Sequence, residues 1–393
     1  MSGLSSPLLL VIFLASAAVI WGTGTVLSDS TDVLSRRLRL GEALGGAILL
    51  AIATNLPEIA ITTSAALTHR VDIAVGNILG GIAIQTAVLA LLDAVGVRRR
   101  LPLTYLAASL TLVIECALVV AMLLVVVMST QLPESVIVAR LTPGVVLIAL
   151  LWIVGLLLVR RARRGLPWPT AAGETDTTAG ETDTAAGETD TADTATTTAG
   201  KTTAAGDATA GGDAATAGGK VKEAQPVRAK RARLRTTGIG RASVVFALGA
   251  AATLTAGVFA TLSGEVLFGR LGLSGVVFGA TVLAAVTALP EVTTGLAATR
   301  LGDYQLAFSD IVGGNAFLPV LFLLATVLSG QSVLPKAHHT DIYLTALGGL
   351  LTLVYLVGLV FRPRRQWLRM GPDSITVLVL YAVGVVGLAL VPS

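Results

Sequence analysis

The chain has 393 residues, of which 54% are hydrophobic and 13% are charged, and its mean hydropathy is +0.81. Soluble proteins carry about 25% charged residues, so this composition excludes an ordinary soluble protein. The net charge of +4 could suggest a nucleic-acid partner. However, the basic residues stand beside apolar segments, where they act as orientation signals, and we expect no nucleic acid to bind. The single cysteine, Cys116, lies in an apolar segment, so disulfides play no part.

Apolar segments recur along the chain, and each is close to the ~20 residues that span a bilayer as a helix. The first lacks a preceding Lys or Arg, so we expect a retained span rather than a cleaved signal peptide, followed by a loop with Asp29, Asp32 and Arg36. The predicted spans cover residues 7–25, 41–68, 72–95, 103–128, 142–160, 242–263, 272–299, 304–329, 341–361 and 374–391. The sequence therefore predicts an all-α polytopic membrane protein with ten transmembrane helices.

A hydrophilic segment, residues 161–240, separates the first five spans from the last five. The unit Gly-Glu-Thr-Asp-Thr begins at Gly173, Gly180 and Gly187, without the apolar positions of a coiled coil. Low hydrophobicity predicts a disordered linker between two five-helix halves, 1–160 and 241–393. Its end carries a basic patch, which is an orientation signal or, alternatively, a regulatory or lipid-binding element. The patch consists of Lys220, Lys222, Arg228, Lys230, Arg231, Arg233 and Arg235.

Alternate loops differ in basic charge. One set is rich in arginine: Arg36, Arg37 and Arg39; Arg98, Arg99 and Arg100; the 161–240 segment; Arg300; and Arg362, Arg364, Arg365 and Arg369. The opposite set holds only Arg70, Arg140, Arg270 and Lys336. By the positive-inside rule, the 161–240 segment is cytoplasmic and both termini lie outside. Because each half has an odd number of spans, the two halves insert with opposite orientation and form inverted repeats.

A carboxylate follows a proline twice within apolar spans, in Thr54-Asn55-Leu56-Pro57-Glu58 and Thr287-Ala288-Leu289-Pro290-Glu291. Proline removes a backbone donor and breaks the helical hydrogen-bond pattern, which a membrane tolerates only where the freed groups face protein or a wet cavity. An ionisable residue at such a place is a functional-site hypothesis. Two copies indicate an internally duplicated transporter.

A glycine pair follows each motif in the next span. Gly80-Gly81 and Gly313-Gly314 each begin 22 residues after the glutamate. Glycine pairs expose backbone carbonyls for binding or, alternatively, simply allow helices to pack closely. The equal spacing supports α-repeats at about 41–95 and 272–329.

These motifs resemble those of the calcium:cation antiporter superfamily, the family of sodium/calcium exchangers. Its repeats read Gly-Thr-Ser-x-Pro-Glu, then Gly-Asn-x-x-Gly-Ser-Asn-x-x-Asn/Asp. The matching positions are Thr54, Pro57, Glu58, Asp72, Gly76, Asn77 and Gly80 in the first half, and Thr287, Pro290, Glu291, Gly313, Asn315 and Phe317 in the second. The resemblance implies that Glu58 and Glu291 face each other near the membrane midplane, beside Thr54 and Thr287, and bind the cation.

The chain departs from the family pattern at several positions. Asn55 and Ala288 replace the serines of the first block, and Gly81 and Gly314 those of the second. The family's final Asn or Asp, a cation ligand, becomes Gln85 in one half and Leu318 in the other.

Some of the replacements keep an oxygen ligand. Asn55 and Gln85 can still offer a carbonyl oxygen to a hard cation, whereas Leu318 cannot. Asp310 occupies the repeat position of Asn77, as a ligand, a proton relay or an interhelical hydrogen-bond partner. For Glu115, packing or lipid distortion is the favoured role over transport.

Two buried carboxylates are balanced by one Ca²⁺, or by two Na⁺ or two H⁺. A third Na⁺ would leave a costly positive charge in hydrocarbon. The Gln85 substitution resembles the proton-coupled branch of the superfamily, so Ca²⁺/H⁺ exchange remains open beside the preferred Na⁺/Ca²⁺ exchange. A passive cation channel and a non-transporting scaffold are further alternatives.

No nucleotide-binding motif Gly-x-x-x-x-Gly-Lys-Ser/Thr occurs, so we expect no ATP dependence. We also expect no enzymatic activity and no resident cofactor. The expected partners are the lipid bilayer and small cations, in the plasma membrane of a prokaryote; the sequence leaves the oligomeric state open.

Overall fold

The structure is a computed structural model, and it describes residues 1, 3–37, 52–97, 101–163, 238–388 and 390–391. Most of the predicted linker, including the basic patch, lies outside these residues, as do Arg39 and Arg98 to Arg100. The described residues all belong to one compact unit.

The described chain is helical, without β-strands. In chain order the helices are α1 (Ser6–Arg37), α3 (Leu56–Leu67), α4 (Val71–Leu91), η2 (Leu92–Gly96), α5 (Leu103–Ala107), α6 (Leu110–Thr130), α7 (Pro143–Arg163), α9 (Ile239–Gly269), α10 (Gly275–Phe278), η3 (Gly279–Leu283), α11 (Ala284–Thr287), α12 (Leu289–Leu301), α13 (Tyr304–Phe317), η4 (Leu318–Val320), α14 (Leu321–Ser329), η5 (Leu334–Lys336), α15 (His339–Phe361) and α16 (Pro372–Leu388). Within the described ranges, eight helical segments are long and apolar enough to cross a membrane, and two shorter apolar helices, α3 and α16, accompany them. The prediction of an all-α polytopic membrane fold is confirmed.

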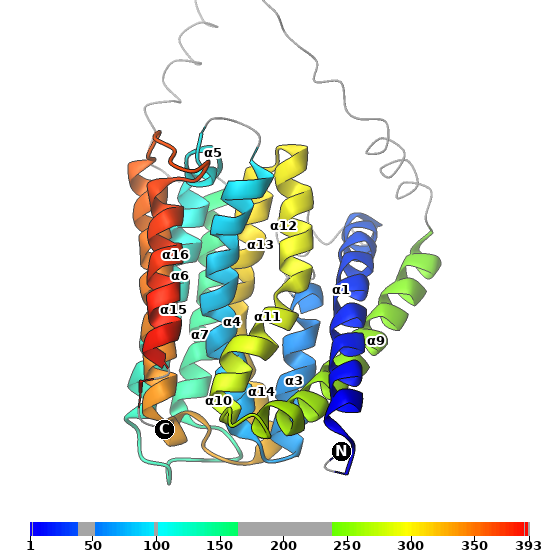
Figure 1. The fold of residues 1–393 in the computed structure, drawn as a ribbon. Helices are drawn as coiled ribbons and strands as arrows, with labels where there is room; N and C mark the ends of the chain where they lie inside the picture. The colour runs from blue at the N-terminus through cyan, green and yellow to red at the C-terminus, as the bar shows by residue number, and fades with distance from the viewer. Residues whose placement is uncertain (2, 38–51, 98–100, 164–237, 389, 392–393) are drawn as a thin grey trace, which may run out of the picture. The chain divides into compact units, whose positions relative to one another are not determined.

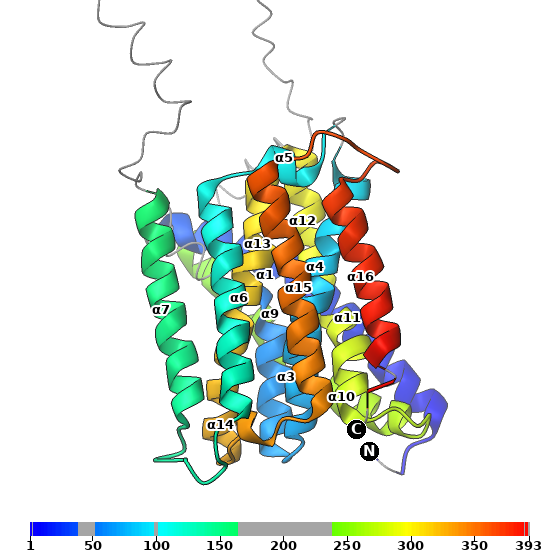
Figure 2. The same cartoon turned by 90° about the vertical axis from the view of Figure 1, so that its left-hand side faces the viewer.

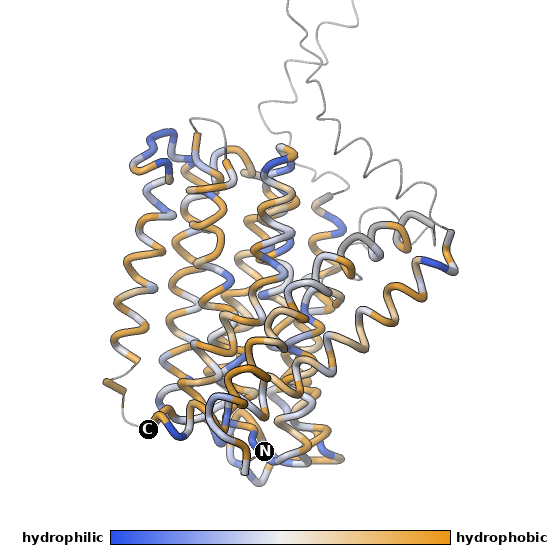
Figure 3. Tube along the Cα trace, turned by 45° about the vertical axis from the view of Figure 1, so that its right-hand side comes forward, coloured by the Kyte–Doolittle hydropathy of each residue, from blue (hydrophilic) through white to orange (hydrophobic). Residues whose placement is uncertain are grey.

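The helices run alternately between two ends of the bundle (Figures 1 and 2). Both chain termini lie at one end, which we call the terminal end; α7 ends and α9 begins at the opposite end, which we call the linker end. Along the Cα trace, hydrophobic residues cover most of each helix, and hydrophilic ones gather at the helix ends and at a few interior positions (Figure 3). This pattern is that of a bundle surrounded by lipid.

Several predicted boundaries are wrong. The loop expected after residue 25 does not begin there, because α1 continues to Arg37. The predicted span 103–128 consists of two helices, α5 and α6, because Ala108 and Ser109 leave the helical conformation and the Ser109 hydroxyl caps α6. The span 304–329 contains a short 3₁₀ turn, η4, at Pro319, which cannot donate a helical hydrogen bond.

The two halves repeat the same local structures at opposite ends of the bundle. The loop before α7 closes with a Val138–Leu141 bridge, and the loop before α16 with a Trp367–Met370 bridge, 229 positions later. Each loop holds two consecutive residues with positive φ, Ala139 and Arg140 in one and Leu368 and Arg369 in the other. One loop lies at the terminal end and the other at the linker end, as an inverted repeat requires (Figure 2).

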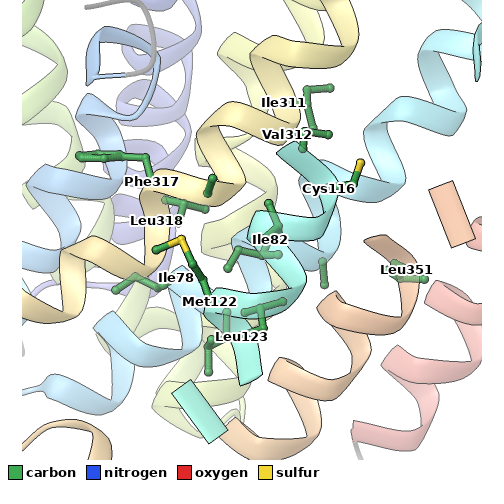
Figure 4. Packing of buried hydrophobic residues seen from close by; sticks show 14 of the residues in the cluster. Ile78, Ile82, Cys116, Met122, Leu123, Ile311, Val312, Phe317, Leu318 and Leu351 are labelled. Atoms are coloured by element: carbon green, nitrogen blue, oxygen red, sulfur yellow. The ribbon is translucent and has the colours of Figure 1, made fainter. Parts of the chain in front are cut away.

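The core is formed mainly by α4, α6, α13, α14 and α15. Ile78 and Ile82 of α4 lie in a cluster with Met122 of α6 and Leu318 of η4 (Figure 4). This apolar cluster holds the third and fourth spans of both halves together by burial of hydrophobic side chains.

The long helices α1 and α9 pack along each other beside this core, and the Thr23 and Thr253 hydroxyls share a hydrogen bond of 2.6 Å. Gly24 of α1 lies against the ring of Pro290, and Gly257 of α9 lies against Ala60 and the Pro57 carbonyl. Each long helix therefore touches the proline-containing motif of the opposite half.

Helix α4 approaches the η3 turn at backbone distance. Cβ atoms added at Gly76 or Gly80 would overlap the backbone of Val276 or Ala280. The turn η3 is a π-helix, a form that often marks functional sites. Gly80, the first glycine of the pair Gly80-Gly81, thus allows this close approach of the two helices.

Candidate functional site

Both motif glutamates lie in the first turn of a helix that starts inside the bundle. The helical path is interrupted at Asn55 before α3 and at Ala288 between α11 and α12, and a proline follows in the first turn of each new helix. Glu58 and Glu291 come next and are completely buried, with exposures of 0% and 1%. The positive end of each helix dipole faces its own carboxylate, which partly offsets the cost of burying it.

The structure brings the two glutamates together from opposite halves. Glu58 and Glu291 are close enough to interact electrostatically. The Gln85 amide nitrogen donates a hydrogen bond of 3.2 Å to Glu58 Oε1, and the Thr287 side chain also interacts with the Glu58 carboxyl. Glu58 thus receives one partner from each repeat.

Several oxygens at this site are buried without a hydrogen-bond partner in the described chain. They are Glu58 Oε2, both carboxylate oxygens of Glu291, Gln85 Oε1 and Asp310 Oδ1. The described residues contain no ion pair that joins a basic side chain to either glutamate. A cluster of unpartnered acceptors without a base is the donor chemistry that a hard cation or a proton requires.

Asp310 extends the acidic cluster on the Glu291 side. It interacts electrostatically with Glu291, and its Oδ2 accepts a hydrogen bond of 2.7 Å from Thr294, one turn after Glu291 on α12. Both predicted roles of Asp310, in the cation site and in an interhelical hydrogen bond, are compatible with this geometry.

The remaining predicted residues lie around the same point. Asn55 Nδ2 contacts the Thr54 hydroxyl at 3.5 Å, and Gly314 lies next to the Asn55 amide. Gly81 packs on the Leu318 side chain, so the two departures from the family pattern face each other. Gly313, by contrast, has open space where a Cβ would stand.

Three polar residues near the site were not among the predicted cation ligands. Asn315 Nδ2 donates to the Thr86 hydroxyl at 3.0 Å, which links the glycine-bearing helices of the two halves. Asn77 is fully buried, and neither its amide oxygen nor its amide nitrogen has a partner in the described chain. Asn77 and Asn315 stand in the family motif and could have been selected from it, whereas Thr86 follows Gln85 without any motif signal.

Glu115 of α6 contacts α13. Its Oε2 accepts a hydrogen bond of 2.8 Å from Ser309, and it is buried against neighbouring helices. This interhelical hydrogen bond is compatible with the packing role that the sequence favours. Within the described ranges, no three His, Cys, Asp or Glu side chains are grouped as a metal centre, so cation binding would need the hydroxyl, amide or backbone oxygens as well.

A bundle of apolar helices around two facing carboxylates, each at a helix break, defines a membrane transport protein. The profile of the sodium/calcium exchanger protein family matches residues 8–161 and 242–390. The chain therefore belongs to this family, whose members are membrane antiporters. A comparison with curated protein sequences gives no match.

Solved structures show the same fold. The sodium-calcium exchanger NCX_Mj matches with a TM-score of 0.54 and 15% identity, over 97% of this chain and 99% of that one. The H⁺/Ca²⁺ exchanger CAX matches with a TM-score of 0.61 and 12% identity, over 98% and 82%. YfkE matches with a TM-score of 0.56 and 12% identity, over 97% and 92%. The predicted superfamily is confirmed.

Proposed function

We propose that this protein is a secondary-active antiporter that exports Ca²⁺ in exchange for Na⁺ by alternating access. The observation that carries the proposal is the pair Glu58 and Glu291, contributed by inverted halves and buried side by side without a base in the described chain. Such a pair must be balanced by one divalent ion or two monovalent ions. Competition between these occupants for one site is the basis of exchange.

The proposed cation ligands are Glu58, Glu291, Thr54, Thr287, Asn55, Gln85 and Asp310. Carboxylate, amide and hydroxyl oxygens together suit Ca²⁺, which takes six to eight oxygen ligands. The helix breaks at Asn55 and Ala288 lie beside the carboxylates and could add backbone carbonyls.

Proton coupling is the second candidate, and Gln85 supports it. The side chain beside Glu58 is the neutral amide of Gln85, where the family carries an Asn or Asp ligand. The charge to be balanced is then that of the two glutamates, and two protons would neutralise it. Na⁺ and H⁺ coupling differ in one measurable property, the gradient that drives Ca²⁺ uptake.

Calcium flux in proteoliposomes, with Na⁺ and H⁺ gradients imposed separately, tests the proposal. We expect Ca²⁺ to accumulate against its own gradient when Na⁺ runs in the opposite direction, and not with a pH gradient alone. Accumulation driven only by the pH gradient would establish the second candidate. Equilibration without accumulation would identify a channel, and no flux would identify a scaffold.

We further propose a cytoplasmic linker end, with both termini outside, in a prokaryotic plasma membrane. Arginines gather at the linker end: Arg160 and Arg161 at the end of α7, Arg241 at the start of α9, Arg300 at the end of α12, and Arg362, Arg364, Arg365 and Arg369 before α16. This bias supports the orientation by the positive-inside rule. The halves 1–160 and 241–393, joined by a disordered linker over 161–240, complete the proposed organisation.

Replacing Gln85 with leucine is expected to weaken Ca²⁺ transport without unfolding the protein. The change removes the hydrogen bond to Glu58 and a possible ligand oxygen, and a hydrogen bond to a charged group contributes roughly 1.5–3 kcal/mol. The apparent Ca²⁺ affinity in vesicle uptake should fall by about tenfold or more. Gln331→Leu, at a half-buried glutamine of the terminal end, is the control and should keep the parent affinity. Equal affinities in the two variants would exclude Gln85 from the site.

A further inference from the structure

A second pair of buried carboxylates lies near the linker end, outside the site described above. Asp93 is part of η2, the π-helical turn that ends the α4 span. It stands eight residues after Gln85, about 12 Å further along the helix axis at the standard rise per residue. This pair is therefore spatially separate from Glu58 and Glu291.

Asp93 has a clear structural role. Its Oδ1 accepts a hydrogen bond of 2.8 Å from the Leu103 backbone, and its Oδ2 accepts bonds of 2.7 Å and 2.8 Å from the Gly371 backbone and the Ser374 hydroxyl. Asp93 thus fastens the starts of α5 and α16 to the end of the α4 span, and these donors explain why it is buried.

Asp373 is held less firmly than Asp93. It is only 6% exposed, and neither of its carboxylate oxygens has a partner in full hydrogen-bond geometry in the described chain; the Thr104 side chain and the Ser374 backbone are the hydrogen-bonding groups next to it. It faces Asp93, and the side chains of Thr104 and Tyr355 lie beside it. The Thr104 hydroxyl is buried, and Asp373 is the group next to it. Two buried carboxylates and the Thr104 hydroxyl therefore converge on one point.

The inverted repeat shows that the fold does not need this carboxylate. The loops before α7 and α16 have equivalent structures 229 positions apart, so Asp373 corresponds to Gly144 and Gly358 corresponds to Ser129. In the first half Gly144 packs on Ser129; in the second half the Asp373 carboxylate packs on Gly358. The equivalent contact in the first half contains no acidic residue. The fold that the two halves share therefore does not require a carboxylate at the position of Asp373.

No basic side chain forms an ion pair with Asp93 or Asp373 among the ion pairs of the described chain. Adjacent buried carboxylates require a counter-charge. We propose that Asp93 and Asp373, with the hydroxyls of Thr104 and Ser374, form a second site for a hard cation of the Ca²⁺ type. An all-oxygen donor set suits such an ion. The bound cation would cross-link the ends of α4, α5 and α16.

Terbium luminescence tests this site independently of transport. The background is the double variant Glu58→Gln/Glu291→Gln, which lacks both proposed transport carboxylates. Tyr355 interacts with both aspartates, so it should sensitise Tb³⁺ bound between them. We expect one saturable luminescence signal that Ca²⁺ displaces, and a higher melting temperature in Ca²⁺. Absence of a Ca²⁺-displaceable signal at pH 8 would overturn the proposal and show that protons alone neutralise the pair.

Single substitutions in the same background locate the signal. Asp373→Asn should abolish it, and Thr104→Val, which leaves the Asp93 hydrogen bonds intact, should weaken Tb³⁺ binding by about tenfold if one ligand is lost. Tyr355→Phe should dim the luminescence while Ca²⁺ still raises the melting temperature. Asp303→Asn, at an exposed helix cap of the linker end, is the matched control and should change nothing. If Asp373→Asn does not fold, the Tb³⁺ affinity of Thr104→Val becomes the test of the site. Tb³⁺ luminescence and affinity that are unchanged in the variants that fold would overturn the assignment.

Discussion

Replacing Glu291 with glutamine is expected to abolish gradient-driven Ca²⁺ uptake, and Glu58→Gln should do the same. Each change removes one of the two charges that a divalent ion would balance, while the other carboxylate stays buried without a base in the described chain. Ca²⁺ affinity depends on the number of charged ligands, so a site that keeps only one of the two carboxylates should bind Ca²⁺ much more weakly. Uptake into proteoliposomes should therefore fall by ~100-fold or more, to the level of empty vesicles.

The control for this experiment is Glu134→Gln. The Glu134 side chain is exposed in the loop before α7, and its ion pair with Lys336 in the described chain is long, at 4.0 Å. This variant should transport Ca²⁺ at the parent rate. Gradient-driven uptake retained in either the Glu58 or the Glu291 variant would remove the paired-carboxylate site from consideration.

Gly80→Ala is expected to destabilise the protein strongly, whereas Gly313→Ala should be tolerated. The two glycines are equivalent in the repeats, but a Cβ at Gly80 would overlap the Ala280 backbone, and a Cβ at Gly313 meets no atom within 4 Å. Overpacking costs about 1–3 kcal/mol where side chains can adjust, and a backbone neighbour adjusts less easily. At Gly313, alanine gains up to ~1 kcal/mol of helix propensity.

Melting of the purified variants in detergent, followed by size-exclusion chromatography, measures this difference. We expect a clear fall in melting temperature and in monodisperse yield for Gly80→Ala, and parent-like behaviour for Gly313→Ala. Similar melting temperatures would show that α4 and η3 are not held in backbone contact at Gly80.

The sequence predicted the framework because membrane insertion leaves a strong signal. Runs of about 20 apolar residues and alternating basic loops depend on the bilayer itself. Boundaries were less accurate where a helix continues beyond the apolar run, as α1 does through Arg37. Charged residues there end the hydrophobic pattern but not the helix, because an α-helix satisfies its own backbone hydrogen bonds.

The candidate site was predictable to the extent that it lies in the repeated motif. Proline at a helix start and a glutamate in the first turn pointed to Glu58 and Glu291 directly, and the structure places them near enough to interact electrostatically. The unequal neighbours of Gly80 and Gly313 were not predictable, because equal spacing along a chain does not fix what packs against each helix. The Thr86–Asn315 hydrogen bond likewise depends on how the halves meet.

The crossed contacts of α1 and α9 bear on how ions would reach the two glutamates. Gly24 of α1 lies on Pro290, Gly257 of α9 lies near Pro57, and a threonine pair fastens the two long helices together. A displacement of this joined pair would uncover both helix breaks in a single step. Glu58 and Glu291 would then gain or lose access to water at the same time. A cation bound by both would never be held between one hydrated and one dehydrated carboxylate.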